Sequence, residues 1–199
     1  MSRPAITGVI LAGGLARRMG GVDKGLQILK GQTMVQHAVD RLRPQVDELL
    51  INANRHAKEY ERFAPVIGDV IAGYAGPLAG LHAAMHHARH DWVVTVPCDS
   101  PGLPVYLYER LWLGIKSHGA DLALAAPGTQ WHPVFCLCRR DLQADLERQL
   151  QDGLRRFESW CQSLSHTVVD FSDNAAAFHN LNTLDDMATY NASSSPSTS

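Results

Sequence analysis

An α/β fold is predicted for this sequence, with one mostly parallel sheet covered by helices on both faces. Short apolar runs alternate with segments whose apolar residues recur every three or four positions. The run at residues 92–96 is apolar apart from one threonine, which is typical of a strand covered on both faces. Strands separated by helices favour parallel pairing through crossover connections.

The first predicted elements are a strand at residues 5–11 and a helix at residues 33–42. Later strands are expected where apolar runs stop at turn-forming residues, at 48–51, 65–67, 92–96, 121–126 and 134–138. Two further helices are indicated by apolar residues at helical spacing: Leu78, Leu81, Met85 and Ala88 in one, and Leu142, Leu146 and Leu150 in the other. We see no linker or repeat, so we predict a single Rossmann-like domain over residues 1–190. Residues 191–199 are rich in Ser, Thr and Pro and are predicted to form a disordered tail.

Composition limits the partners of the protein. The chain has 199 residues and a formal net charge of -2, so neither nucleic acid nor a membrane is expected as a main partner. No apolar run approaches the ~20 residues of a membrane-spanning helix. The four cysteines form no CxxC pair, and Cys136 and Cys138 alternate on a strand, which favours buried thiols over a metal site. A reducing, cytoplasmic location is therefore expected.

Four polar features follow predicted strands directly: the Gly13–Gly14 pair, Asn52, Asp69 and Asp99. In open parallel sheets, ligands bind at the carboxyl ends of the strands. Each residue taken alone is explained as well by its preference for turns. All four together, with Lys24 nearby, favour a ligand-binding crevice.

The loop after the first strand is rich in glycine and positive charge. Residues 11–24 contain four glycines together with Arg17, Arg18 and Lys24. Lys24 is followed by Gly25 and the glycine spacing differs from a Walker A loop, and the segment is not GxGxxG either. Glycines allow backbone N–H groups to approach phosphate oxygens, and the cations neutralise them, although a basic surface turn would have the same composition. Asp99, emerging from an apolar strand, could hold Mg²⁺, which prefers one or two carboxylates with water and phosphate oxygens.

The segment from Leu11 to Lys24 resembles the LAGGxxxRMGxxDK signature of the molybdenum cofactor guanylyltransferases. LAGG alone is shared with sugar-phosphate nucleotidyltransferases, but the resemblance extends in order over nearly the whole chain. The further matching motifs are Asn52-Ala53-Asn54-Arg55, Gly68-Asp69, Gly76-Pro77-Leu78-Ala79-Gly80, Pro97-Cys98-Asp99-Ser100-Pro101, His132-Pro133 and Asn180-Leu181-Asn182-Thr183.

The resemblance implies a nucleotidyltransferase-type fold and an Mg²⁺-dependent transfer of GMP from GTP to the terminal phosphate of Mo-molybdopterin. It implies GTP contacts at Leu11, Ala12, Gly13, Lys24, Asn52, Asp69 and Asp99, with Asp99 also holding the metal. Catalytic roles are expected for Lys24, Asp99 and Arg18. The matching pterin-side positions are Gly76, Gly80, Arg155, Arg156, Asn180 and Asn182. Transient contacts with molybdenum-insertion and molybdoenzyme maturation proteins are expected too.

Three other functions share parts of this pattern. A cytidylyltransferase acting on the same pterin would carry LAAG and lack the Gly-Pro-Leu-Ala-Gly motif, and a sugar-phosphate nucleotidyltransferase is usually longer. A non-catalytic nucleotide or cofactor carrier would not need both Asp99 and Lys24.

The histidines His82, His86 and His90 recur every four residues, a spacing that can bind metal on a helix. We expect instead a solvated helix face, because they fall off the apolar stripe.

Overall fold

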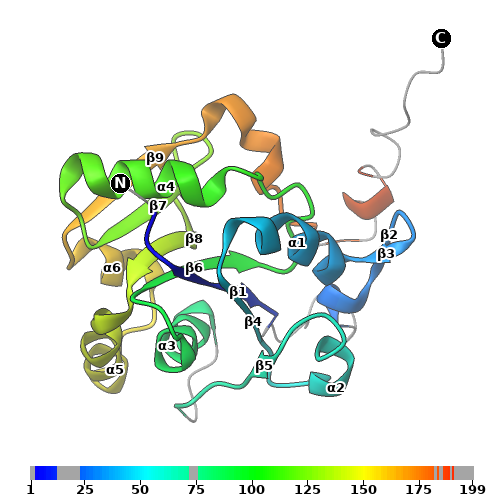
Figure 1. Cartoon of the computed structure of the whole chain (residues 1–199), viewed down its shortest axis with the longest axis horizontal. Helices are drawn as coiled ribbons and strands as arrows, with labels where there is room; N and C mark the ends of the chain where they lie inside the picture. Colours follow the sequence, from blue (N-terminus) through cyan, green and yellow to red (C-terminus); the bar gives the residue numbers. More distant parts are fainter. Residues whose placement is uncertain are drawn as a thin grey trace.

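The computed structural model describes residues 3–12, 23–71, 76–181, 183, 186–188 and 190. Its centre is a seven-stranded sheet in the order β5-β4-β1-β6-β8-β7-β9 (Figure 1). The strands are β1 (Ile6–Leu11), β4 (Glu48–Asn52), β5 (Val66–Ile67), β6 (Trp92–Pro97), β7 (Leu122–Ala126), β8 (His132–Arg139) and β9 (His166–Asp170). A separate two-stranded hairpin is formed by β2 (Ile28–Leu29) and β3 (Gln32–Thr33).

The sheet is parallel except at β8. The pairs β1–β4, β1–β6, β4–β5 and β7–β9 are parallel, whereas β8 runs antiparallel to both of its neighbours, β6 and β7. Residues 127–131, which join β7 to β8, are too few for the crossover that parallel neighbours require. The predicted mostly parallel sheet is confirmed, and the reversed strand is its one exception among the described residues.

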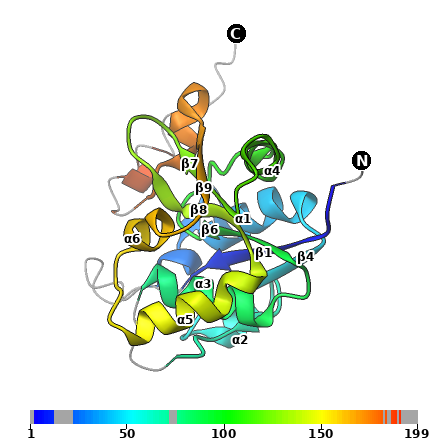
Figure 2. The same ribbon diagram turned by 90° about the vertical axis from the view of Figure 1, so that its left-hand side faces the viewer.

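Helices cover both faces of the sheet, as predicted. Figures 1 and 2 show α1 (Met34–Leu42) and α4 (Leu107–His118) on one face, with α3 (Pro77–His87) and α5 (Gln143–Gln151) on the other. The short helix α6 (Phe157–Gln162) packs into the same core as α3 and α5. Strand β1 supplies both cores by alternation: Ile6 and Ile10 enter the α1 and α4 side, and Val9 the other.

Local sequence signals explain where two helices begin. The Thr33 hydroxyl accepts from the Gln36 backbone N–H at 3.3 Å, and this N-cap starts α1. Gly76 precedes α3 with a φ of 133°, a conformation that favours glycine, and Pro77 occupies the first helical position. The predicted stripe of α3, from Leu78 to Ala88, is buried, and each fully buried leucine or methionine there contributes about 1.5–3 kcal/mol to folding.

Several elements lie beyond the sequence-based prediction. It contained neither α4 nor β9 and did not include the short helices α2 (Ala57–Tyr60) and α6. The stripe of α4, Leu107, Leu111 and Ile115, has helical spacing, but aromatic and apolar residues on its other faces hide the pattern. Leu142 lies in a 3₁₀ turn just before α5 rather than in the helix itself.

The four cysteines are free and buried, as the alternation in β8 indicated for Cys136 and Cys138. No helix in the described ranges has both the length and the apolar character needed to cross a membrane. The predicted tail at residues 191–199 lies outside the described residues, and the boundary at residue 190 stays a prediction.

Candidate active site

The carboxyl ends of four parallel strands meet at one edge of the sheet. Beyond the strand ends, the Ala12 N–H donates to the Asn52 carbonyl at 2.8 Å and the Cys98 N–H to the Leu11 carbonyl at 3.1 Å. The Ala53 N–H donates to the Ile67 carbonyl at 2.9 Å. These bonds continue the pairing by one residue past β1, β4 and β6. The side chains of Asn52, Asp69 and Asp99 therefore emerge from one edge.

Two asparagines hold the Asp69 carboxylate in place. Asn52 Nδ2 donates to one carboxylate oxygen at 3.0 Å, and Asn54 Nδ2 donates to the other at 2.7 Å. The Asp69 backbone N–H in turn donates to Asn54 Oδ1 at 2.8 Å. Both oxygens of Asp69 are thus fixed at the end of β5. Asn54 was not among the predicted site residues, although it belongs to the quoted motif that starts at Asn52.

Helix α3 closes this side of the site through a residue that has no side chain. A Cβ added at Gly80 would lie 2.7 Å from Asn52 Oδ1 and 3.1 Å from Leu11 Cδ2. Gly80 therefore lets α3 approach the ends of β1 and β4, where a larger residue would displace Asn52. Gly80 was predicted for the pterin side, and its nearest neighbours in the structure are residues predicted for the nucleotide side.

Lys24 and Asp99 form an ion pair at the same edge. Lys24 Nζ lies 3.5 Å from Asp99 Oδ2, and the two side chains are 24% and 13% exposed. Burial raises the pKa of the Asp99 carboxyl, and the Lys24 ammonium opposes that rise. The Lys24 ammonium thus favours the ionised form of Asp99, which is the form that could bind Mg²⁺ together with phosphate oxygens.

Asn180 joins the loop that carries Asp99. The Ser100 hydroxyl donates to Asn180 Oδ1 at 2.7 Å, and the Leu181 N–H donates to the Asp99 carbonyl at 2.9 Å. A segment eighty residues further along the chain therefore lies against Asp99 and Ser100. This places one predicted pterin-side residue next to the predicted metal ligand.

His132 is a further residue of this edge that sequence reasoning did not assign to the site. It begins β8, and because β8 is reversed, its first residue lies at the edge where the parallel strands end. Burial lowers the pKa of His132, and the nearby Asp99 carboxylate opposes this effect. The His132-Pro133 motif was the available signal, but its meaning depends on the direction of β8.

Among the remaining predicted site residues, two arginines are described by the structure and three residues are not. Arg155 and Arg156 lie between α5 and α6, where Arg155 donates to the Leu150 carbonyl at 3.1 Å and to the Leu154 carbonyl at 2.7 Å. These bonds do not link Arg155 to the sheet edge, so its role and that of Arg156 stay predictions. The structural positions of Gly13, Arg18 and Asn182 lie outside the described residues.

The expectation of a solvated histidine face on α3 is wrong for His82. Its side chain is 1% exposed and packs against α5, with Nε2 2.7 Å from Gln143 Nε2 and 3.5 Å from Glu147 Oε2. The other ring nitrogen, Nδ1, is buried without a partner among the described residues. The docking of α5 on α3, which the spacing of histidines cannot reveal, buries this residue. His86 and His87 are exposed, and α3 ends before His90.

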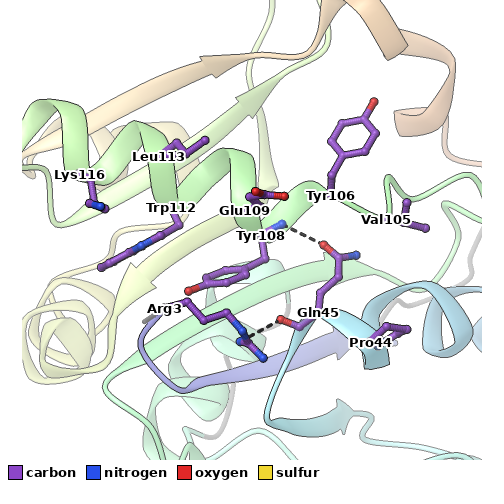
Figure 3. A pocket seen from close by; sticks show the side chains of 10 residues that line it. All are labelled: Arg3, Pro44, Gln45, Val105, Tyr106, Tyr108, Glu109, Trp112, Leu113 and Lys116. Atoms are coloured by element: carbon purple, nitrogen blue, oxygen red, sulfur yellow. Dashed lines mark hydrogen bonds between the residues drawn. The ribbon is translucent and has the colours of Figure 1, made fainter. Parts of the chain in front are cut away.

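The structure also contains a pocket of about 360 Å³ away from these residues (Figure 3). Its lining comes mainly from α4 and from the turn that follows α1, and Arg3 and Tyr108 lie at its lower side in the figure. It includes no described residue predicted for the site.

The described residues contain no group of three or more His, Cys, Asp or Glu side chains that could hold a metal by themselves.

Comparisons with known proteins agree with this geometry. Residues 8–167 match the family model of the MobA-like NTP transferase domain. A protein of Shewanella putrefaciens, named molybdenum cofactor guanylyltransferase, is 47% identical over 182 residues, covering 91% of this chain and 93% of the relative. A protein of Cupriavidus pinatubonensis with the same name is 46% identical over 198 residues, covering 96% and 99%.

Solved structures share the fold at lower identity. Molybdopterin-guanine dinucleotide biosynthesis protein A of Archaeoglobus fulgidus superposes with a TM-score of 0.78 at 22% identity, covering 94% of this chain and 97% of that one. A 4-diphosphocytidyl-2C-methyl-D-erythritol synthase from Anaerococcus prevotii gives 0.71 at 11% identity, covering 96% of each chain. At these identities the likenesses show the fold alone.

The fold and the arrangement of its sheet edge define an α/β nucleotidyltransferase. Identity across nearly the full length of the named relatives narrows this class. The chain belongs to the MobA-like NTP transferase family, and the resemblance to the molybdenum cofactor guanylyltransferases found in its motifs is confirmed.

Proposed function

We propose that the protein transfers GMP from GTP to the terminal phosphate of Mo-molybdopterin, forming Mo-molybdopterin guanine dinucleotide and pyrophosphate. One observation carries the proposal: the Lys24–Asp99 pair lies at the same sheet edge as Asn52 and Asp69, in a chain whose relatives are named for this activity. A lysine and a buried carboxylate supply the charges that a triphosphate and its metal require, and the asparagine–aspartate network supplies fixed polar groups for a nucleoside.

The reaction needs alignment more than proton transfer. The second pKa of a phosphate monoester is near ~6, so the acceptor phosphate is largely deprotonated at neutral pH. One of its oxygens attacks the α-phosphorus of GTP. The new P–O bond forms as the bond between the α-phosphorus and its bridging oxygen to the β-phosphate breaks, and pyrophosphate leaves with that electron pair. A general base is therefore unnecessary, and the enzyme mainly positions and neutralises two polyanions.

Described residues supply most of the groups proposed for these tasks. Lys24 contacts the phosphates, and Leu11, Ala12, Asn52 and Asp69 contact the nucleotide. Asp99 would hold Mg²⁺, which when bound neutralises charge that develops between the phosphates. We propose that Gly13 and Arg18 complete the phosphate site, and that Gly76, Gly80, Arg155, Arg156, Asn180 and Asn182 face the pterin.

The cellular setting follows from the proposed reaction. We propose that Mo-molybdopterin arrives through transient contact with proteins that insert molybdenum. The product would leave through contact with proteins that mature molybdoenzymes. A cytoplasmic location fits four buried free cysteines, because thiols stay reduced there.

A substrate panel tests the proposed function. The purified protein is incubated with molybdopterin or its molybdenum-loaded form, Mg²⁺ and each of the four nucleoside triphosphates, and pyrophosphate release is measured. A hexose 1-phosphate replaces the pterin in a parallel series. GTP with the pterin should be strongly preferred, and a chelator should abolish release. Preference for CTP, or transfer to the sugar phosphate, would contradict the proposal, and GTP binding without any transfer would indicate a carrier.

A further inference from the structure

The hydroxyl of Tyr60 lies inside the protein and contacts the segment that carries Lys24. Tyr60 ends the short helix α2, and its side chain is completely buried in the core on the α1 side of the sheet. The hydroxyl donates to Asp23 Oδ1 at 2.5 Å. A buried hydroxyl needs a partner, and Asp23 is the partner that the structure gives it.

The same oxygen of Asp23 also fixes the backbone beyond it. Asp23 is the N-cap of the 3₁₀ turn Lys24–Leu26, and Oδ1 accepts from the Gly25 N–H at 3.1 Å. The turn is closed by the Gln27 N–H, which donates to the Lys24 carbonyl at 3.1 Å. Tyr60 therefore holds the carboxylate that starts this turn, and the first residue of the turn is Lys24.

Gly25 shows how closely Tyr60 and this turn fit together. A Cβ at Gly25 would lie 2.3 Å from the Tyr60 hydroxyl oxygen and 3.2 Å from its ring carbons Cε1 and Cζ. The constraint is one of space, because the hydroxyl occupies the volume that a side chain would need. The Tyr60 hydroxyl thus contacts the turn on both sides of Lys24, at Asp23 and at Gly25.

We propose that Tyr60 is a positioning residue for Lys24: its hydroxyl holds Asp23 and, through the turn that Asp23 caps, directs the Lys24 ammonium to the phosphates beside Asp99. The proposal rests on the proposed function for the identity of the substrate, but the hydrogen bonds that carry it do not. Tyr60 itself lies in the core and would not touch GTP.

The first experiment is Tyr60→Phe, which removes the hydroxyl and keeps the ring. We expect GTP binding, measured by titration without the acceptor, to weaken about tenfold, the coupling expected for residues in one hydrogen-bond network. Tyr108→Phe is the matched control, because Tyr108 is also buried and its hydroxyl donates to the Pro4 carbonyl at 3.5 Å, far from the turn. The control should bind GTP like the wild type. Unchanged GTP binding in Tyr60→Phe would overturn the proposal.

The second experiment tests whether Tyr60 acts through Lys24. Tyr60→Phe is combined with Lys24→Ala in a double-mutant cycle, with GTP affinity and the melting temperature measured for each protein. If the hydroxyl acts by directing the ammonium, its removal should cost less than about twofold in affinity once Lys24 is absent. Equal losses in both backgrounds would show a merely structural role and overturn the proposal.

Gly25→Ala disturbs the same contact by adding a side chain to the turn. It tests the proposal independently if Tyr60→Phe does not fold. The added Cβ should push the hydroxyl from Asp23 and weaken GTP binding, again only while Lys24 is present. A loss that persists without Lys24 would contradict the proposal. If the wild type binds GTP but transfers no GMP, the proposed function fails while this cycle still tests the positioning role.

Discussion

Asn54 and Asp69 bind each other through two hydrogen bonds, one between their side chains and one from the Asp69 backbone to the Asn54 amide oxygen. The pair links the residues after β4 to those after β5, and Asn52 binds the second oxygen of the same carboxylate. Asp69 is thereby held by partners on both of its oxygens before any ligand arrives. Such preorganisation lowers the cost of binding.

Asn54→Ala should weaken GTP binding without unfolding the protein. Asn54 is exposed, so we expect the KM for GTP to rise only about tenfold, the lower end for a lost hydrogen bond to a charged group. Asn54→Asp should be worse, because it places a second carboxylate against Asp69. Steady-state kinetics on both variants would check this order, with the exposed Glu59→Ala as a control. Wild-type kinetics for Asn54→Asp would show that Asp69 does not contact GTP.

Gly80→Ala should damage the site, whereas Gly114→Ala should damage only stability. The Cβ at position 80 would displace Asn52, and we expect kcat/KM for GTP to fall about 10–100-fold from that misplacement. At position 114 the Cβ would lie 2.5 Å from Val169 Cγ2, between α4 and β9, and this overpacking should cost about 1–3 kcal/mol of unfolding free energy. Steady-state kinetics and urea-induced unfolding of the two variants should separate the loss of activity from the loss of stability. Equal kcat/KM values would contradict the role of Gly80.

Asp99→Asn should abolish activity while leaving the fold intact. We expect kcat to fall by at least about 100-fold, because the variant loses the negative charge that would hold Mg²⁺. Burial disfavours the charged form of Asp99, so removing that charge should keep the melting temperature of the metal-free protein unchanged or raise it. Asp99→Ala should be equally inactive. Near-normal GMP transfer by either variant in excess Mg²⁺ would refute the assignment of the metal ligand.

His82 should make the stability of the protein depend on pH. Burial lowers the pKa of His82 below its ordinary value of 6.5, so the unfolded chain takes up a proton that the folded protein does not. The free energy of unfolding should therefore fall as the pH drops from 6.5 toward the lowered pKa. His82→Gln removes this uptake and should lose less stability between about pH 7 and 5. Burial lowers the pKa of His132 in the wild type and in the variant alike. The difference between the two stability curves therefore reports His82. Parallel stability curves would contradict the prediction.

Most of the sheet could be predicted because its strands are local patterns. The apolar run that became β6 and the helical stripe from Leu78 to Ala88 depend only on residues close in sequence. The positions of Asn52, Asp69 and Asp99 after strands were equally visible, and parallel pairing then brings them to one edge. The histidine spacing misled for the opposite reason, since the burial of His82 depends on α5, about sixty residues away.

The sequence by itself therefore determined the α/β class, the strands that end at the site and the family, because alternation, turn residues and ordered motifs are all read along the chain. The tertiary structure alone decided that β8 pairs with β6 as well as with β7, and with this the placement of His132 beside Asp99. It also decided which buried side chain holds the turn of Lys24, because Tyr60 and Asp23 are thirty-seven residues apart. Contacts across such separations follow from packing, which no local pattern encodes.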